Sequence, residues 1–72
     1  MKLYITFGQS HKHKINNLIF DKDCVCVIEC KSLDEGYEIA SKAFGKKWAF
    51  LYIDLSCINL HFYHRGLVPL VV

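Results

Sequence analysis

Hydrophobic and polar residues alternate near the N-terminus. Over residues 2–7, one side of an extended chain would carry Leu3, Ile5 and Phe7, and the other would carry lysine, tyrosine and threonine. This period of two is typical of a β-strand with one buried face. Gly8 follows directly and is expected to end the strand.

Two further segments precede the middle of the chain. Asn16-Asn17 lies between two apolar residues, and asparagine tolerates the positive φ of a tight turn, so Lys12 to Phe20 is either a short hairpin or an irregular excursion. Cys24 to Cys30 reads as a strand that is apolar on both faces, with Cys24, Cys26, Ile28 and Cys30 on one and Val25 and Val27 on the other. A strand with two apolar faces is expected at the centre of a sheet.

An amphipathic helix is predicted from Ser32 to Phe44. Ser32 is a favourable N-cap, and Glu35 three residues later completes a capping box. Gly45 is expected to end the helix, because glycine readily adopts the left-handed conformation found after a helix C-terminus. At 100° per residue, the apolar stripe that should face the sheet consists of Leu33, Tyr37, Ala40 and Phe44.

The C-terminal third predicts more strands. Lys47 to Asp54 is expected to be a second central strand, whose one face carries Trp48, Phe50 and Tyr52. Leu60 to Tyr63 is expected to be a short strand. In the apolar tail, Leu67 to Val72, Pro69 favours an edge or a position outside the sheet.

These elements predict an α+β fold, in which one amphipathic helix packs on a mostly antiparallel four- to five-stranded sheet in ββαββ order. The 72 residues suffice for a single small domain spanning 1–72. One helix covers only one face of a sheet. Because 53% of the residues are apolar or aromatic, the second face needs a cover as well.

Composition narrows the class of function. The net charge of +2 is too small to indicate nucleic-acid binding by itself, and it argues against a mimic of DNA. No N-terminal signal peptide is expected, and the longest apolar run, Trp48 to Ile53, is far shorter than the ~20 residues of a membrane helix. We therefore expect a cytoplasmic protein without membrane contact, whose cysteines are reduced.

The histidines and cysteines are the candidate metal ligands. His11 and His13 point the same way on an extended strand, and His61 and His64 could approach each other across a turn. Zinc needs three or four ligands, and the alternative is that all four are solvated loop side chains. Cysteines at positions 24, 26 and 30 have the spacing of a strand face, which favours a buried core. We expect neither a cofactor nor a catalytic centre.

Basic and aromatic residues are interleaved along the chain. The basic residues concerned are Lys12, Lys14, Lys46, Lys47 and Arg65. Such residues could form a sheet face on which RNA bases stack, although the glycine-aromatic signature of ribonucleoprotein domains is missing. The alternative interpretation is a set of solvated lysines around a packed aromatic layer.

Five stretches resemble a family of short uncharacterised bacteriophage proteins. The opening, Tyr4 to His13, has the pattern Y-x-T-F-G-Q-x-H-x-H, and the likeness continues over Phe20 to Val25. It resumes at Ala43-Phe44-Gly45, at Trp48-Ala49-Phe50 and at Arg65-Gly66, so it covers most of the chain. The resemblance implies phage origin and assigns no role to any residue. Small phage proteins commonly bind and block a host protein, as anti-CRISPR proteins do.

Two functional hypotheses follow. The first is a small non-enzymatic protein of phage or mobile-element origin that binds a host protein, such as an inhibitor of a host defence system. The second is a nucleic-acid-binding or metal-binding module that uses the histidine pairs and the basic residues. The residues expected to contact a partner are Tyr4, Trp48, Phe50, Tyr52 and Arg65.

Self-association is also expected, most simply as a homodimer. No obvious cover within one copy is available for Val25, for Val27, for the strand face with Trp48, Phe50 and Tyr52 or its aliphatic counterpart, or for the tail. Monomers rarely expose contiguous apolar patches beyond about 300–600 Å². The competing possibility is that the tail folds back over the open face.

Overall fold

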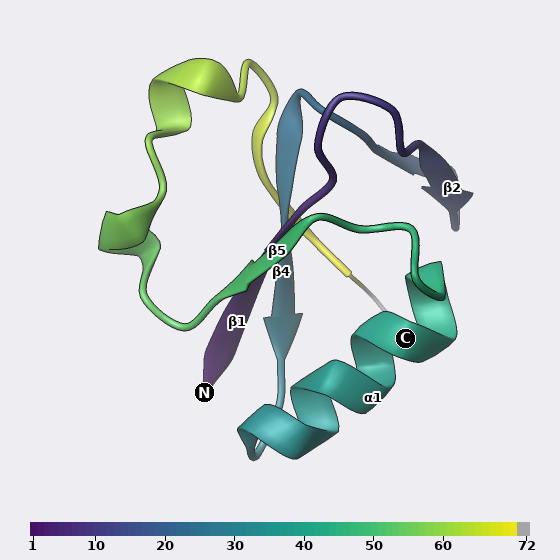
Figure 1. The fold of residues 1–72 in the computed structure, drawn as a ribbon, viewed down its shortest axis with the longest axis vertical. Coiled ribbons are helices and arrows are strands. Elements are labelled where there is room, and N and C mark those ends of the chain that lie inside the picture. Colours follow the sequence, from purple (N-terminus) through teal and green to yellow (C-terminus); the bar gives the residue numbers. More distant parts are fainter. Residues whose placement is uncertain (71–72) are drawn as a thin grey trace.

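The computed structural model describes residues 1–70, which form an α-helix, a four-stranded sheet and a separate two-stranded hairpin (Figure 1). The elements are β1 (Lys2–Thr6), β2 (His13–Ile15), β3 (Leu18–Phe20), β4 (Cys24–Glu29), α1 (Leu33–Phe44), β5 (Phe50–Tyr52) and β6 (Gly66–Pro69), with 3-10 turns η1 (Leu55–Cys57) and η2 (Leu60–Phe62) before β6. The strand order in the sheet is β5-β1-β4-β6. The α+β class is therefore confirmed.

Two details of the predicted sheet need correction. The sheet is mixed, because β6 runs parallel to β4 while β1 pairs antiparallel with both β4 and β5. The ββαββ order holds within the four-stranded sheet, but the β2-β3 hairpin is inserted between its first two strands. The sequence could not indicate the parallel pair, because β6 reaches its partner through the long connection 53–65.

The hairpin forms where the asparagine pair predicts a turn. Asn16 and Asn17 have φ values of 51° and 66°. Consecutive positive φ angles characterise the two-residue turns that match the twist of a hairpin. His13 pairs with Phe20 across it. The ring of Phe20 lies in the main core beside Phe7 and Phe44, so the hairpin is anchored to the rest of the domain.

The helix begins and ends as predicted. The Ser32 side chain accepts a hydrogen bond from the Glu35 N–H, at 3.2 Å, and the Glu35 carboxylate accepts one from the Lys31 N–H, at 3.0 Å. Gly45 has a φ of 62°, and its N–H donates to the Ser41 carbonyl. Capping of these otherwise unpaired groups defines both ends of α1.

The buried side of α1 differs from the prediction. Gly36, Ala40 and Phe44 are buried, whereas Leu33 and Tyr37 are 41% and 46% exposed. The reason is Gly36, which allows the helix to approach β1 closely. A Cβ atom at this position would lie 1.9 Å from Cδ1 of Leu3. The helix is therefore rotated so that its glycine, rather than Leu33 and Tyr37, faces the sheet.

Strand β5 is shorter than predicted and lies at an edge of the sheet rather than at its centre. The Ala49 N–H donates to the Thr6 carbonyl at 2.8 Å, and Phe50 is also paired with Thr6. Two residues facing one across a pair of strands form a β-bulge, which bends the strand and ends regular pairing. The bulge separates Trp48 from the face that Phe50 and Tyr52 share, so the predicted three-residue row is wrong.

The connection from β5 to β6, residues 53–65, covers part of the second face of the sheet. Beginning at one edge strand and ending at the other, it lies on the opposite side of the sheet from α1 (Figure 1). Thr6 and Val25, which lie on that second face, are 3% and 0% exposed. Val25 therefore does have a cover within one copy, contrary to expectation. The residues of the predicted strand at Leu60 to Tyr63 instead form the 3-10 turn η2, with Tyr63 as its C-cap.

The C-terminal strand follows the expectation for Pro69. Strand β6 is an edge strand, and the Leu70 N–H donates to the Val27 carbonyl at 2.9 Å. Backbone groups alternate in direction along a strand, so the proline nitrogen is turned to the free edge, where no N–H is needed. Leu70 packs against the core on the helix side, while the predicted tail residues Val71 and Val72 lie outside the described residues.

Candidate binding surface

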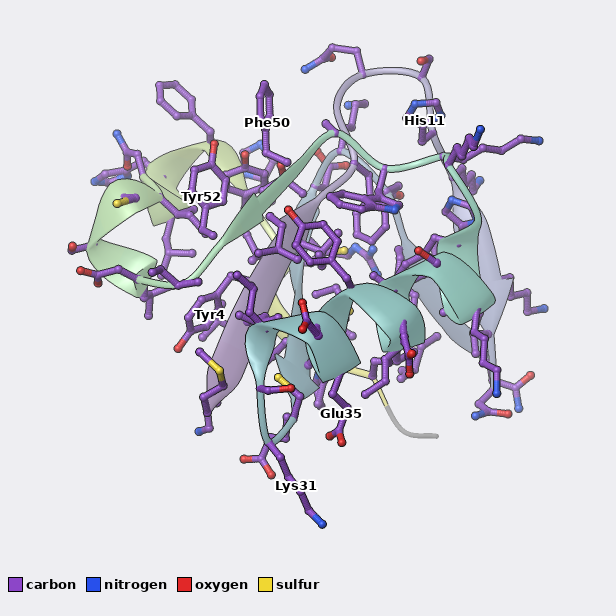
Figure 2. The ribbon with its side chains drawn as sticks, turned by 60° about the horizontal axis from the view of Figure 1, so that its bottom comes forward. Tyr4, His11, Lys31, Glu35, Phe50 and Tyr52 are labelled. Atoms are coloured by element: carbon purple, nitrogen blue, oxygen red, sulfur yellow. The ribbon has the colours of Figure 1, made fainter. Side chains whose placement is uncertain are left out.

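Three of the predicted contact residues gather on the sheet face opposite α1. Tyr4 and Tyr52 are directly paired across β1 and β5, and the ring centroids of Phe50 and Tyr52 are 6.2 Å apart. Phe50 is 62% exposed. Figure 2 shows Tyr4, Tyr52 and Phe50 as a row beside the 3-10 segment. We call these three residues the aromatic row.

The connection 53–65 carries further exposed apolar side chains. Ile53 and Phe62 are 64% and 74% exposed, and Leu60 is 39% exposed. The sequence interpretation missed these residues because it assigned a strand here. A signal was available in Asp54 and Asn59, whose side chains accept hydrogen bonds from the N–H two residues further on and cap the 3-10 turns η1 and η2.

The outer edge of β5 is free of pairing within residues 1–70. The Cys30 N–H donates to the Met1 carbonyl, so Met1 directs its backbone groups toward the chain of β4. Because backbone groups alternate in direction along a strand, the odd-numbered residues of β1 face β4 and the even-numbered residues face β5. Tyr52 is paired with Tyr4 and therefore directs its backbone groups toward β1. The neighbouring residue, Leu51, directs its N–H and carbonyl away from β1. The Leu51 side chain, in contrast, packs against the core.

Trp48 lies apart from the aromatic row, on the side of the helix. Its ring centroid is 6.0 Å from that of Tyr37, and its Nε1–H donates to the Gly45 carbonyl at 3.1 Å. Trp48 is partly buried against the core, so its main contacts are internal. The outer surface of α1 beside this pair has a shallow, open hollow lined by Tyr37, Glu38, Ser41 and Lys42.

Arg65 lies at the opposite edge of the sheet and binds within the protein. Its Nη2 donates to the Asp21 carboxylate at 3.1 Å and to the Ile19 carbonyl, and its backbone N–H donates to the Asp23 carbonyl at 2.9 Å. It thereby ties the start of β6 to the end of the hairpin. Partial burial tends to raise the pKa of Asp21, but hydrogen bonds from the Asp23 N–H and Arg65 outweigh it and lower that pKa.

The two histidine pairs come from separate parts of the chain's fold. His11 is on the loop before the hairpin (Figure 2), whereas His61 belongs to η2 and His64 to the turn before β6. His13 packs against Phe7 and Phe44, and its Nε2 is 2.7 Å from the Lys47 carbonyl. Within residues 1–70, no three histidine, cysteine or acidic side chains are grouped closely enough to hold a metal ion.

The cysteines are free thiols, and the three from the β4 region form part of the core, as their spacing predicts. Cys24, Cys26 and Cys30 are buried, whereas Cys57 is exposed. Burial raises the pKa of Cys24, and burial with the nearby Cys24 thiol raises the pKa of Cys26 to about 12. A thiol with a raised pKa remains protonated at neutral pH and is a poor nucleophile.

Several basic residues gather around the hairpin and the end of α1. The contacts of His13 with Phe44 and Lys47 bring these two parts together. The lysines that flank the junction are Lys12, Lys14, Lys42, Lys46 and Lys47. Asp34 and Glu35 lie in the first turn of α1, so the helix runs from an acidic end to this basic end.

Comparison with protein-family models, curated proteins and solved structures gave no match to this chain. Among residues 1–70, no helix has the length and apolar character required to cross a bilayer.

Proposed function

We propose that this chain is a small non-enzymatic binding protein of phage or mobile-element origin, and that it binds a host protein in the host cytoplasm through the aromatic row. An inhibitor of a host defence system is the class of protein we favour. The observation that carries the proposal is the exposure of Phe50 beside Tyr52, next to a strand edge that is unpaired within residues 1–70. Exposed aromatic side chains at the centre of an apolar patch are typical of protein-protein contacts.

The titratable groups support a binding role rather than a catalytic one. Shifted pKa values in the described chain belong to Asp21, Asp54, Cys24 and Cys26. Hydrogen bonds from Ser56 lower the pKa of Asp54, the internal Arg65 contact accounts for Asp21, and burial accounts for the thiols. Strong pKa shifts often mark active sites, but each of these has a structural cause.

Affinity capture from host lysate tests the proposal with matched variants. The tagged wild type should retain a specific host protein, and Phe50→Ser should lose it. Leu67→Ser is the control, because Leu67 is 42% exposed on the same sheet face but belongs to the opposite edge strand. Retention of the same proteins by all three would contradict a contact through the aromatic row.

The basic residues around the hairpin favour a second candidate function, the binding of nucleic acid. Five lysines lie on the hairpin, on the loop before it and around the end of α1, and clustered basic residues favour contact with phosphate groups even where the net charge is only +2. This candidate predicts heparin retention that falls steeply with salt and is weakened by Lys14→Glu with Lys47→Glu. Elution of wild type and variant at the same low salt concentration would contradict it.

A further inference from the structure

We propose that two copies of this chain pair through their β5 edges, antiparallel and about a two-fold axis at Leu51, to form one continuous eight-stranded sheet. The proposal goes beyond host-protein binding, because it concerns the backbone edge and names a second copy as its occupant. Three features of the β5 edge support it, namely its pairing register, the apolar side chains beside it and the lack of like charges that would repel a second copy.

The backbone register makes β5 complementary to itself. Leu51 is the central residue of a three-residue strand and directs its N–H and carbonyl outward. In an antiparallel pair centred on Leu51, each copy donates one hydrogen bond and accepts one, so both outward groups are satisfied. Isologous interfaces require this kind of self-complementarity, and two-fold dimers are the commonest closed assembly.

The same register brings aromatic side chains together. With Leu51 opposite its counterpart, Phe50 of each copy lies opposite Tyr52 of the other in a non-hydrogen-bonded pair, where side chains approach most closely. Both residues lie on the face opposite α1. The two aromatic rows would then join into one larger apolar surface on the face of the combined sheet opposite α1, and this surface stays available to a host protein.

Exposed apolar side chains border the pairing edge. Phe50, on the strand itself, is 62% exposed, and Ile53, directly after the strand, is 64% exposed. Monomers rarely leave large contiguous apolar patches exposed, so apolar side chains beside an unpaired strand edge favour contact with a second copy.

Charge does not oppose the pairing. Between Trp48 and Phe62, Asp54 is the only acidic residue, and there is no lysine or arginine. The Asp54 carboxylate caps η1 by accepting a hydrogen bond from the Ser56 N–H at 3.0 Å. Like charges in an interface disfavour association, and none is brought together here.

The opposite edge is less suited to pairing. Strand β6 directs Leu67 and Pro69 outward, and proline has no N–H to donate. When the added strand is a second copy, the two hydrogen bonds of Leu51 are accompanied by two Phe50–Tyr52 contacts, which favours self-pairing.

Sedimentation equilibrium from micromolar to millimolar concentration tests the proposal. The wild-type mass should rise from 8.4 kDa toward twice that value. Phe50→Lys, a charge at an exposed position, should remain at the monomer mass with an unchanged circular dichroism spectrum, and Leu67→Lys should still dimerise. A wild-type mass that stays at 8.4 kDa, or a Leu67→Lys variant that loses the dimer while Phe50→Lys keeps it, would overturn the β5 pairing. The measurement uses purified protein alone, so its failure is distinguishable from failure of lysate capture.

Discussion

Gly36 determines how closely α1 approaches the sheet. Replacement by alanine usually stabilises a helix by about 0.5–1 kcal/mol. Here the added Cβ would meet Leu3 Cδ1 at 1.9 Å, Leu3 Cγ at 3.1 Å and Cys30 Sγ at 3.2 Å. Overpacking of this kind costs about 1–3 kcal/mol, so Gly36→Ala should lower the free energy of unfolding by about 1 kcal/mol. Urea denaturation measures this, with the exposed Ser41→Ala as control; a variant more stable than wild type would show that Leu3 moves away freely.

Asp21 should make stability dependent on acid pH. Its pKa is lower in the folded protein than in the unfolded chain, so the ionised carboxylate favours folding. This contribution is present above the unfolded-state pKa of about 3.9 and is lost as pH falls through the folded-state value. The urea midpoint of wild type should exceed that of Asp21→Asn at pH near 7, and the difference should shrink on acidification below that unfolded-state pKa. A difference that is independent of pH would exclude the carboxylate as its source.

At the scale of elements, Phe44 rather than Leu33 should anchor the helix. The Phe44 ring lies 4.9 Å from the Phe7 ring and 5.4 Å from the Phe20 ring, nearly edge-on to both. Phe44→Ala should therefore cost about 3–5 kcal/mol, whereas truncation of the 41% exposed Leu33 should cost less than about 1 kcal/mol. Equal losses of unfolding free energy would mean that the helix is rotated toward the stripe that the sequence predicts.

The cysteines report on the burial of β4. Under native conditions one thiol, that of Cys57, should react rapidly with a thiol reagent, and the buried Cys24, Cys26 and Cys30 should react slowly. In denaturant all four should react. The comparison of Cys57→Ser with wild type identifies the fast thiol. Rapid reaction of two or more thiols in the folded protein would contradict the packing of β4 beneath α1.

The elements that the sequence predicts well are those defined by local chemistry. Ser32, Glu35 and Gly45 define the ends of α1, and Asn16-Asn17 defines the hairpin turn. The rotation of α1 was missed because helical periodicity places large apolar residues inside, whereas close packing at Gly36 excludes them. Strand β5 was overextended because alternation continues through Trp48, where the bulge opposite Thr6 redirects the chain.

The whole-molecule arrangement depends on contacts between distant residues. Of the five predicted contact residues, Tyr4, Phe50 and Tyr52 come together, because β5 pairs with β1. Arg65 is placed at the opposite edge, because its hydrogen bonds to Asp21 and Asp23 fix the start of β6 beside β4. No local pattern in the sequence indicates either pairing.

The free edge of β5, bordered by the aromatic row, is the central feature of the molecule. Residue-resolved amide hydrogen exchange tests its role most directly, because Leu51 directs its N–H outward and has no partner strand there within residues 1–70. Leu67, which is directed outward from β6 at the opposite edge, provides the matched control amide. Exchange at Leu51 should be fast in dilute protein and become slower as concentration rises, while exchange at Leu67 stays unchanged. Equal exchange at Leu51 across all concentrations, or equal slowing at both edges, would contradict pairing through β5.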